Sequence, residues 1–530
     1  MPRITVDGRS YEVAEGRTLL QALDDLGVLM NGVDLPHYCW HPKLSIDGSC
    51  RLCQVEVEGL PKLQIACNTP VKDGMEVRTT TERVRRAREG VMELLLLNHP
   101  LDCPICDQAG ECKLQDYAFE YGVPHARTRE PRRPGRKRVE LGPTVVFDEE
   151  RCILCRLCVR FCREVPGTGE LGVASRGDRS TIETFPGQPL DNPYSMNVAD
   201  ICPVGALTTR DFRFKIRVWF LDEVPGLCTG CATGCNVHLG VANNKVYRYV
   251  PRRNDAVNDT WICDHGRLSY KAIGADDRLV EPALRQEDGR LCSSSAEQAL
   301  AEAAARIRQA VADKGPSVVG ALASAHATNE DLFTLRRLLE GIGTDIAGLP
   351  VVLGESDDLL VSPEKAANAT GARALGFGDP HPVLERLRGG GLDVLLVLGH
   401  DVLELLEEEP PLVGLASLIL LDTHHSPLER WAQVVLPARH AAEKLGTLTN
   451  RDGRVQRLQP AVEPGWDARS EGEWLQALGR ALELPGFEGT WDPHALSKAM
   501  GESVPAFAGV HLDSVGETGQ VLRGVAEAGE

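Results

Sequence analysis

The sequence contains the triplet Cys152-Ile153-Leu154-Cys155-Arg156-Leu157-Cys158 and, further along the chain, the pair Cys202-Pro203. Three cysteines separated by two residues each, with a remote Cys-Pro, form a spacing typical of [4Fe–4S] ligation. Zinc ribbons do not use such a triplet. Cys162 stands where a chain with two clusters would supply a ligand to its second cluster. No second triplet lies beside Cys202, so we expect Cys162 to be a free thiol, with cluster ligation as the alternative.

Another group of thiols lies near the N-terminus and consists of Cys39, Cys50, Cys53 and Cys67. Its spacing, C-x10-C-x2-C-x13-C, resembles the plant-type [2Fe–2S] pattern, although the first gap is ten residues instead of four. A zinc site is the alternative. The surrounding sequence predicts a small β-rich domain, with a type I′ hairpin at Asp7-Gly8 and a short helix over 19–26 that Thr18 caps.

Between these groups lies a mixed set of one imidazole and three thiols, His99, Cys103, Cys106 and Cys112. It follows a predicted amphipathic helix over 82–98, which Pro100 terminates. A neutral imidazole in place of a thiolate makes a cluster less negative and raises its reduction potential. A zinc ion bound by three cysteines and one histidine is the alternative for this set.

The last group is Cys228, Cys231, Cys235 and Cys263, spaced C-x2-C-x3-C-x27-C. Two of the 17 cysteines, Cys162 and Cys292, are then left over. Fifteen cysteines and His99 make sixteen ligands, or four sites of four. Zinc could satisfy any one group, but it does not account for four different patterns, one of them a [4Fe–4S] triplet. A redox-inactive zinc scaffold is the competing hypothesis.

Composition narrows the class of protein. The 530 residues include 58 Lys and Arg against 76 Asp and Glu, a net charge of −18, which argues against general nucleic-acid binding. No apolar run reaches 18 residues and the N-terminus lacks an apolar leader, so we expect a reducing compartment and no membrane span. The basic run from Arg127 to Arg138 is predicted to be a solvated connector, with docking onto an acidic partner as the alternative.

The 238 residues after Cys292 contain no cysteine and alternate helical with strand patterns. Ser294 and Glu297 predict a capping box for a helix to Asp313, and a second helix is expected from Thr328 or Asn329 to Leu339. Apolar runs predict strands at 318–323, 392–398 and 418–421, hence a doubly wound α/β layer. Gly389-Gly390-Gly391 lacks a phosphate-loop pattern, and His424-His425 is expected to be loop structure.

Several stretches resemble the large iron–sulfur subunit of respiratory complex I, the NADH–quinone oxidoreductase. The stretches are Ile46–Cys53, Asn98–Pro104, Asp200–Thr208 and Trp261–Arg267. The last of them also resembles the [4Fe–4S] motif that opens molybdopterin oxidoreductases, which only some bacterial members of the family keep. Val434–Ala438, Glu443–Asn450 and Gly453–Gln456 resemble the molybdopterin oxidoreductase domain itself.

The resemblance implies a multidomain α+β and α/β architecture with five domains. They are a plant-ferredoxin-like β-grasp [2Fe–2S] domain (1–80), a one-His/three-Cys [4Fe–4S] domain (81–120), a bacterial-ferredoxin-like [4Fe–4S] domain (121–215), a molybdopterin-oxidoreductase-type [4Fe–4S] domain (216–272) and a shortened molybdopterin-oxidoreductase-like α/β domain (273–530). A working pterin enzyme of this type needs a metal ligand well past the fourth group, and no cysteine follows Cys292. We therefore expect the last domain to be a catalytically silent scaffold without molybdenum.

The function implied is electron relay, with one [2Fe–2S] and three [4Fe–4S] clusters and no substrate-converting site. Electrons would enter from a partner subunit that oxidises NADH through FMN, and would leave to a downstream iron–sulfur subunit on the way to quinone. Within the chain the expected order is the set of Cys39, then that of Cys152, then that of His99. The implied location is the cytoplasmic side of the bacterial inner membrane. An iron–sulfur subunit of an NAD-linked hydrogenase or formate dehydrogenase is the alternative.

Overall fold

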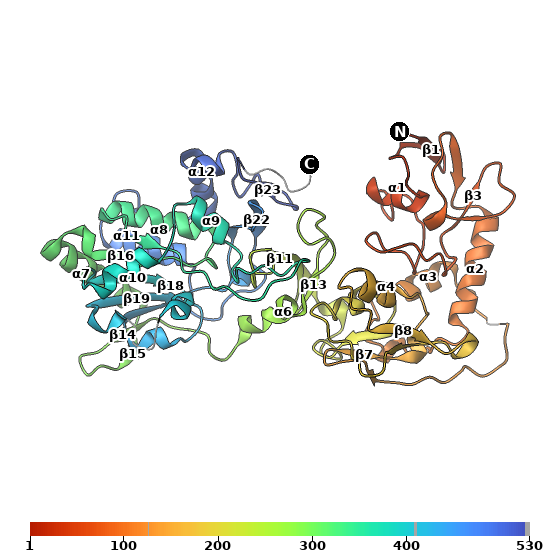
Figure 1. Ribbon diagram of the computed structural model, residues 1–530, viewed down its shortest axis with the longest axis horizontal. Helices are drawn as coiled ribbons and strands as arrows, with labels where there is room; N and C mark the ends of the chain where they lie inside the picture. The colour runs from red at the N-terminus through yellow and green to blue at the C-terminus, as the bar shows by residue number, and fades with distance from the viewer. Residues whose placement is uncertain (126, 407–410, 525–530) are drawn as a thin grey trace. The chain divides into compact units, whose positions relative to one another are not determined.

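The computed structural model describes residues 1–125, 127–406 and 411–524. Residue 126 of the third predicted domain and residues 407–410 and 525–530 of the last one lie outside it. The chain divides into two compact units, Met1–Leu221 and Asp222–Glu530 (Figure 1). The five domain ranges above remain predictions. Within the described part, no helix has both the length and the apolar character that crossing a bilayer requires.

The elements of the first unit are, in chain order, β1 (Arg3–Val6), β2 (Arg9–Glu12), α1 (Leu19–Asp25), β3 (Gln54–Val57), β4 (Gln64–Ile65), β5 (Met75–Arg78), α2 (Glu82–Leu96), α3 (Lys113–Tyr121), β6 (Val139–Glu140), β7 (Val145–Phe147), α4 (Leu157–Glu164), β8 (Leu171–Ala174), β9 (Thr181–Thr184), α5 (Asn197–Asp200) and β10 (Leu207–Thr209). The first five strands form one sheet in the order β2-β1-β5-β3-β4. Parallel pairing of β1 with β5 and packing of α1 close this small β domain.

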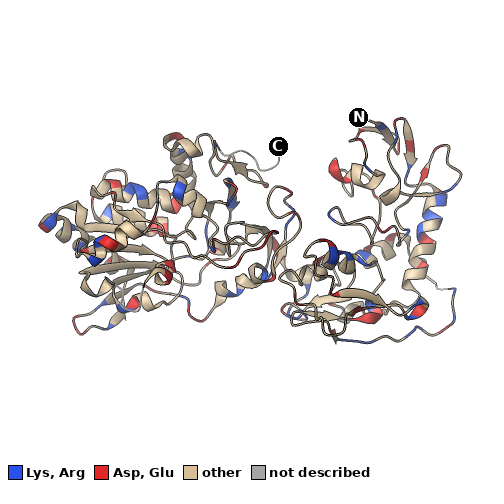
Figure 2. Ribbon diagram, in the orientation of Figure 1, with Lys and Arg blue, Asp and Glu red and all other residues tan. Residues whose placement is uncertain are grey.

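Local sequence signals in the first unit are confirmed. Asp7 and Gly8 both have positive φ, 47° and 81°, as the type I′ turn between β1 and β2 requires. Thr18 and Gln21 form a capping box at the start of α1. Helix α2 begins at Glu82, as predicted, and ends at Leu96 with Leu97 as its C-cap. Figure 2 shows basic and acidic residues side by side along α2, in agreement with the i,i+4 ion pairs Arg86–Glu82 and Arg85–Glu89.

The elements of the second unit are β11 (Asp222–Leu227), β12 (Asn236–Ala242), β13 (Lys245–Pro251), α6 (Asp264–Leu268), β14 (Ala283–Arg285), β15 (Leu291–Ser293), α7 (Ala296–Lys314), β16 (Val319–Leu322), α8 (Asn329–Ile342), β17 (Ala347–Gly348), α9 (Ala369–Ala374), α10 (His381–Arg388), β18 (Val394–Leu398), β19 (Ser417–Asp422), β20 (Ala432–Pro437), β21 (Gly446–Thr449), β22 (Arg454–Leu458), α11 (Glu471–Ala481), α12 (Pro493–Ser503) and β23 (Gln520–Val521). A three-stranded sheet, β11-β12-β13, opens the unit, and a seven-stranded sheet in the order β15-β14-β20-β19-β18-β16-β17 forms its centre.

The seven-stranded sheet is covered on both faces, as a doubly wound layer requires. Strands β17, β16, β18, β19 and β20 are parallel neighbours. Alternate residues of β18 point to opposite cores: Leu396 packs with helices α7, α8 and α11, whereas Leu395 packs with α10. The three predicted strands are therefore confirmed, with bounds that differ by one or two residues.

One predicted capping box is wrong by one position. The side chain that caps α7 belongs to Ser295, which accepts from the backbone N–H of Gln298, whereas Ser294 and Glu297 are the pair expected from sequence. Both serines are followed three residues later by Glu or Gln, so the sequence pattern fits two registers. At α8 the predicted Thr328 cap is confirmed, and its reciprocal partner is Asp331.

Candidate iron–sulfur sites and a polar cavity

The four ligand sets are numbered here by their order along the chain. The first set, Cys39, Cys50, Cys53 and Cys67, converges at one edge of the β domain. Cys39 shares a hydrogen bond with Cys50, and Cys53 shares one with Cys67. The bond from Cys67 lowers the pKa of Cys53, and the nearby Cys39 opposes this shift. The backbone N–H of Cys50 donates to Sγ of Cys39 at 3.5 Å. Gly48 and Arg51 adopt positive φ on either side of Cys50, so the loop turns tightly, as expected from its glycine.

The third set surrounds a small enclosed cavity in the first unit. Cys152, Cys155, Cys158 and Cys202 all line this cavity together with apolar side chains. Leu154 and Arg156 have positive φ, 52° and 60°, and the N–H of Leu154 donates to Sγ of Cys152 at 3.4 Å. Burial raises the pKa of Cys152 to about 12, so an isolated thiolate is unfavourable here and a bound cation would offset that cost.

The second set surrounds the start of α3. Cys112 directly precedes this helix. Burial is the main cause that raises the pKa of Cys112 to about 11, and the nearby thiols of Cys106 and Cys103 add to this shift. Burial lowers the pKa of His99 to about 4, so its imidazole is neutral, the form that binds metals. Nδ1 of His99 is buried and has no hydrogen-bond partner among the described residues.

The fourth set lies in the second unit, at the ends of β11 and β12. The thiols of Cys228, Cys231 and Cys263 all contribute to raising the pKa of Cys235, after burial as the main cause. Gly266 is required at this place, because a Cβ there would lie 2.8 Å from Sγ of Cys228 and 3.2 Å from Sγ of Cys263. The N–H of Gly266 also donates to Sγ of Cys263 at 3.3 Å.

The first and third sets are directly adjacent. Helix α4 connects them: Nη2 of Arg160 donates to the carbonyl of Cys39 at 2.5 Å, and Glu164 accepts from the N–H of Ser45 at 2.7 Å. Cys39 is one of the groups that raise the pKa of Cys155, after burial and closer thiols. The loop of one set is thus held against the helix of the other.

The third and second sets share a backbone segment. The carbonyl of Pro203 lies 3.9 Å from Sγ of Cys112. An added Cβ on Gly205 would lie 2.3 Å from Sγ of Cys106, so only glycine allows this approach. Cys106 is also among the groups that raise the pKa of Cys202. The Cys202-Pro203-Val204-Gly205 segment therefore holds one ligand of the third set and contacts two thiols of the second.

A tyrosine lies between the first and second sets. Tyr38 is buried, its ring contacts that of Tyr117, and its hydroxyl is 3.5 Å from the carbonyl of Lys113. Burial raises its pKa, and Cys112 and Cys50 add to that shift, so both sets are near the phenol. Each of these two sets also has a thiol near the third set: Cys39 is near Cys155, and Cys106 is near Cys202.

The residues present fit iron–sulfur clusters. Within residues 1–125, 127–406 and 411–524, no three His, Cys, Asp or Glu side chains are grouped so as to hold a single metal ion. Iron–sulfur clusters accept N–H donors at their sulfur ligands. The N–H groups directed at Cys39, Cys152 and Cys263, and the glycines at Cys106 and Cys263, provide such surroundings.

The two remaining cysteines lie in different surroundings. Cys162 is fully buried in α4, and burial raises its pKa to about 12. Cys292 is half-buried in the short strand β15. Neither has a disulfide partner among the described residues, and their assignment as spare thiols stays a prediction.

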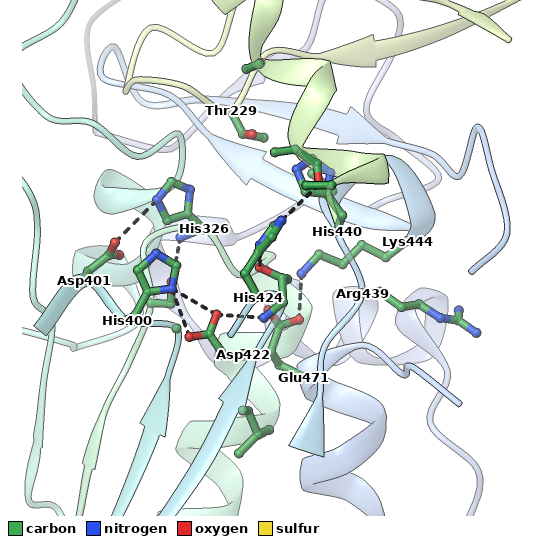
Figure 3. Close-up of a pocket in the computed structure, with 18 of the residues that line it drawn as sticks. Thr229, His326, His400, Asp401, Asp422, His424, Arg439, His440, Lys444 and Glu471 are labelled. Atoms are coloured by element: carbon green, nitrogen blue, oxygen red, sulfur yellow. Dashed lines mark hydrogen bonds and ion pairs between the residues drawn. The ribbon is translucent and has the colours of Figure 1, made fainter. Parts of the chain in front are cut away.

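A polar cavity of about 500 Å³ lies at the carboxyl ends of the parallel strands (Figure 3). Strand β16 has β17 on one side and β18 on the other, so the sheet order reverses here, which is where open α/β sheets bind ligands. His326 follows β16, and His400 and Asp401 follow β18. The pair His424-His425 follows β19 as a loop, as predicted, but it also lines the cavity.

Charged and imidazole groups in this cavity are paired across strands. Nδ1 of His400 contacts the Asp422 carboxylate at 2.9 Å, and this hydrogen bond raises the pKa of His400. Lys444 is buried and its Nζ contacts Glu471 at 2.6 Å (Figure 3). Oδ2 of Asp401 is buried without a hydrogen-bond partner among the described residues. The cavity can therefore bind a polar group, although the sequence predicts a catalytically silent domain.

Sequence analysis missed the residues that make these sites contiguous. They are Arg151, Arg160 and Gly205 in the first unit. In the second unit, sequence analysis also missed the cavity residues His326, His400, Asp401 and His440. For the cavity a usable signal existed, because polar residues directly follow the carboxyl ends of predicted parallel strands. For Arg160 and Gly205 the signal is a contact across the chain, which spacing within a motif does not encode.

Five protein families match successive parts of the chain. Residues 2–82 match the 2Fe-2S iron-sulfur cluster binding domain, 88–127 the NADH-ubiquinone oxidoreductase-G iron-sulfur binding region, and 142–208 the ferredoxin-like domain of NADH-quinone oxidoreductase subunit 3. Residues 221–274 match the molybdopterin oxidoreductase Fe4S4 domain, and 358–481 match molybdopterin oxidoreductase. The expected multidomain architecture is confirmed.

Curated relatives have corresponding names. The G subunit of NADH-quinone oxidoreductase from Rickettsia bellii is 40% identical over 343 residues, which are 65% of this chain and 49% of the relative. The mitochondrial NADH dehydrogenase [ubiquinone] iron-sulfur protein 1 of Solanum tuberosum is 41% identical over 64% of this chain and 45% of its own length. The chain thus spans about half the length of these relatives.

Solved structures also resemble parts of the chain. A chain in the crystal structure of NAD⁺-reducing [NiFe]-hydrogenase in the H₂-reduced state has 31% identity, a TM-score of 0.36, and coverage of 41% of this chain and 91% of that one. Acetylene hydratase from Pelobacter acetylenicus has 10% identity, a TM-score of 0.43, and coverage of 52% and 71%. Over 65% of its length, the chain is similar in sequence to the G subunit of NADH-quinone oxidoreductase.

Proposed function

We propose that the chain is an electron-conducting subunit of NADH-quinone oxidoreductase. Its proposed ligand sets are Cys39, Cys50, Cys53 and Cys67 for a [2Fe–2S] cluster, and for three [4Fe–4S] clusters His99, Cys103, Cys106 and Cys112; Cys152, Cys155, Cys158 and Cys202; and Cys228, Cys231, Cys235 and Cys263. Such clusters accept and release single electrons when bound. The protein's own part is to hold the sets at fixed separations in surroundings of low polarity.

The observation that carries the proposal is the contiguity of three sets within one compact unit. The loop of Cys39 is bound to α4 by Arg160, and Gly205 brings the segment of Cys202 against Cys106. Set one therefore adjoins set three, and set three adjoins set two, which supports the relay order first, third, second.

Partners follow from the same arrangement. We propose that an NADH- and FMN-binding subunit docks near the first set, and that a downstream iron–sulfur subunit docks near the second. Leu101 and Ile105 are 67% and 65% exposed on either side of Cys103, an apolar surface of the kind that interfaces cover. The assembly would be peripheral to a membrane complex, on the cytoplasmic side.

Metal analysis after anaerobic purification tests the proposal. One two-iron and three four-iron clusters predict about fourteen irons per chain and no molybdenum. Replacing Cys53, Cys155 or Cys231 by alanine should remove two, four and four irons respectively, since each lies in a different set. Near-stoichiometric zinc would contradict the proposal. Bound molybdenum or hydrogen evolution would instead favour a formate dehydrogenase or a hydrogenase subunit.

A further inference from the structure

Arg151 is a buried cation placed against the second ligand set. Its backbone precedes Cys152 of the third set, but its side chain lies beside Cys106 of the second, since one carbon added to Gly205 would contact both Sγ of Cys106 and Cδ of Arg151. Only 4% of Arg151 is exposed. A guanidinium in such a place needs partners for all of its N–H groups.

The partners of Arg151 leave one nitrogen over. Asp102 accepts from Nη2 at 2.7 Å and from Nε at 3.3 Å, and Asp148 lies 3.5 Å from Nε. Nη1 is buried and has no partner among the described residues. Two carboxylates thus fix the plane of the guanidinium, and its unused donor remains on a side chain that lies beside Cys106.

Both ends of the second set are near this ion pair. Arg151 and Asp102 act with opposite signs on the pKa of His99 and on that of Cys106, after burial as the main cause in each case. Arg151 and Asp102 therefore both lie close to the position of a cluster bound by His99 and Cys106. Net charge and hydrogen bonds to the sulfur atoms are the means by which proteins set cluster potentials.

We propose that Arg151 donates a hydrogen bond through Nη1 to the cluster held by His99, Cys103, Cys106 and Cys112, and raises its reduction potential. This inference rests on the proposed function. A reduced cluster carries one more negative charge than an oxidised one, so a fixed buried cation favours the reduced form. His99 and Arg151 then act in the same direction on one site.

Redox titration of the full chain, followed by electron paramagnetic resonance, tests the proposal. Arg151→Met keeps the apolar stem and removes charge and donors. We expect the second cluster's affinity for an electron to fall on the order of tenfold, which is about 59 mV for a one-electron couple. Arg151→Lys, which keeps the charge, should recover most of the loss. An unchanged potential in Arg151→Met, with the four-iron signal intact, would overturn the proposal.

A matched control and a variant of opposite sign sharpen the test. Arg213 lines the same cavity as Arg151, but its Nη1 donates to Thr208 at 2.8 Å, so Arg213→Met should shift the potential less. Asp102→Asn removes the opposing charge and should raise the potential. If Arg151→Met fails to assemble the cluster, the test rests on Arg151→Lys and Asp102→Asn. The same cluster potential in these two variants and in the wild type would overturn the proposal.

Hyperfine spectroscopy provides a second readout that a purely structural role would not change. After exchange into deuterated water, the second cluster should show an exchangeable proton coupling that is lost in Arg151→Met. The same coupling in Arg151→Met would contradict donation from Nη1. Failure of the proposed function looks different, because the wild-type chain would then show no four-iron signal from this set at all.

Discussion

The cores of the first unit and of the α/β layer of the second unit contain different kinds of side chain. In the β domain of the first unit, the thiols of Cys53 and Cys67 belong to the same core as Leu19 and Val55. In the second unit, the seven-stranded sheet carries aliphatic side chains on both faces and needs no thiol in those cores. We infer that the folding energy has different sources: metal ligation would supply part of it in the β domain, and apolar burial supplies it in the seven-stranded sheet.

Removing iron should separate the two regions most strongly. An iron chelator under reducing conditions should unfold loops of the first unit around its three sets, because buried thiols then lose the cation that offsets their burial. The sheet β16–β20 should stay folded. Hydrogen exchange measured by mass spectrometry should show loss of protection at 39–67 and 103–112, with little change at 394–398 and 417–422.

Uniform loss of protection across both regions would contradict this division of folding energy. Replacing Cys231 by alanine in the iron-loaded chain provides a control within the second unit. That variant should loosen only the turn between β11 and β12 and leave protection at 394–398 unchanged.

Gly205→Ala should break the contact between the second and third sets. The added carbon would lie 2.3 Å from Sγ of Cys106, so the ligand must move. We expect loss of the four irons of the second set, measured by iron analysis and by its resonance signal. Gly90→Ala in α2 is the matched control, because a Cβ there meets nothing within 4 Å. Full iron content in Gly205→Ala would show that this approach is not required.

The second unit should respond to a different kind of change, the loss of a buried charge. Lys444 is 3% exposed in its side chain and lies 2.6 Å from Glu471 and 3.5 Å from Asp331. Lys444→Met leaves these carboxylates unpaired, which costs about 3–5 kcal/mol in the free energy of unfolding. Urea unfolding measures this loss. Lys314→Met, which breaks an exposed pair with Asp393, should cost less than about 1 kcal/mol; equal losses would refute the distinction.

A smaller, pH-dependent effect should also belong to the second unit. Burial raises the pKa of Glu330 to about 7, against opposing hydrogen bonds from Thr447. Between about pH 4.5 and 7 the folded state keeps a proton that the unfolded state has lost, so stability falls as pH rises through this window. Urea unfolding at pH 5.5 and 7.5 should show a smaller decline for Glu330→Gln than for the wild type. Identical slopes would contradict the raised pKa.

Much of the first unit could be predicted because ligand spacing is local information. The triplet at Cys152 and the hairpin at Asp7-Gly8 each depend on residues within a few positions of one another. The predicted capping box of α7 was wrong because two neighbouring serines fit the same pattern, and only packing selects Ser295. Sequence could also not show that Arg151 follows one ligand set in the chain and contacts the other in space.

In the second unit, too, only features encoded by nearby residues could be predicted from the sequence. Its strands were predictable from apolar runs. The cavity was predictable only in part. Polar residues follow the predicted strand ends, but His326, His400 and His440 follow three separate strands that only the sheet order brings together. The pairing of His400 with Asp422 depends on this order, and no short motif encodes it.

The central claim is that the third set lies between the first and the second. Pulsed electron paramagnetic resonance on the intact chain, poised at successive potentials, tests it through the relaxation rates of the cluster signals. We predict that reduction of the third cluster accelerates relaxation of both the [2Fe–2S] signal and the signal of the second set. Acceleration of the [2Fe–2S] signal by the second cluster alone, with no response to the third, would contradict the account and would direct the electron path past Tyr38.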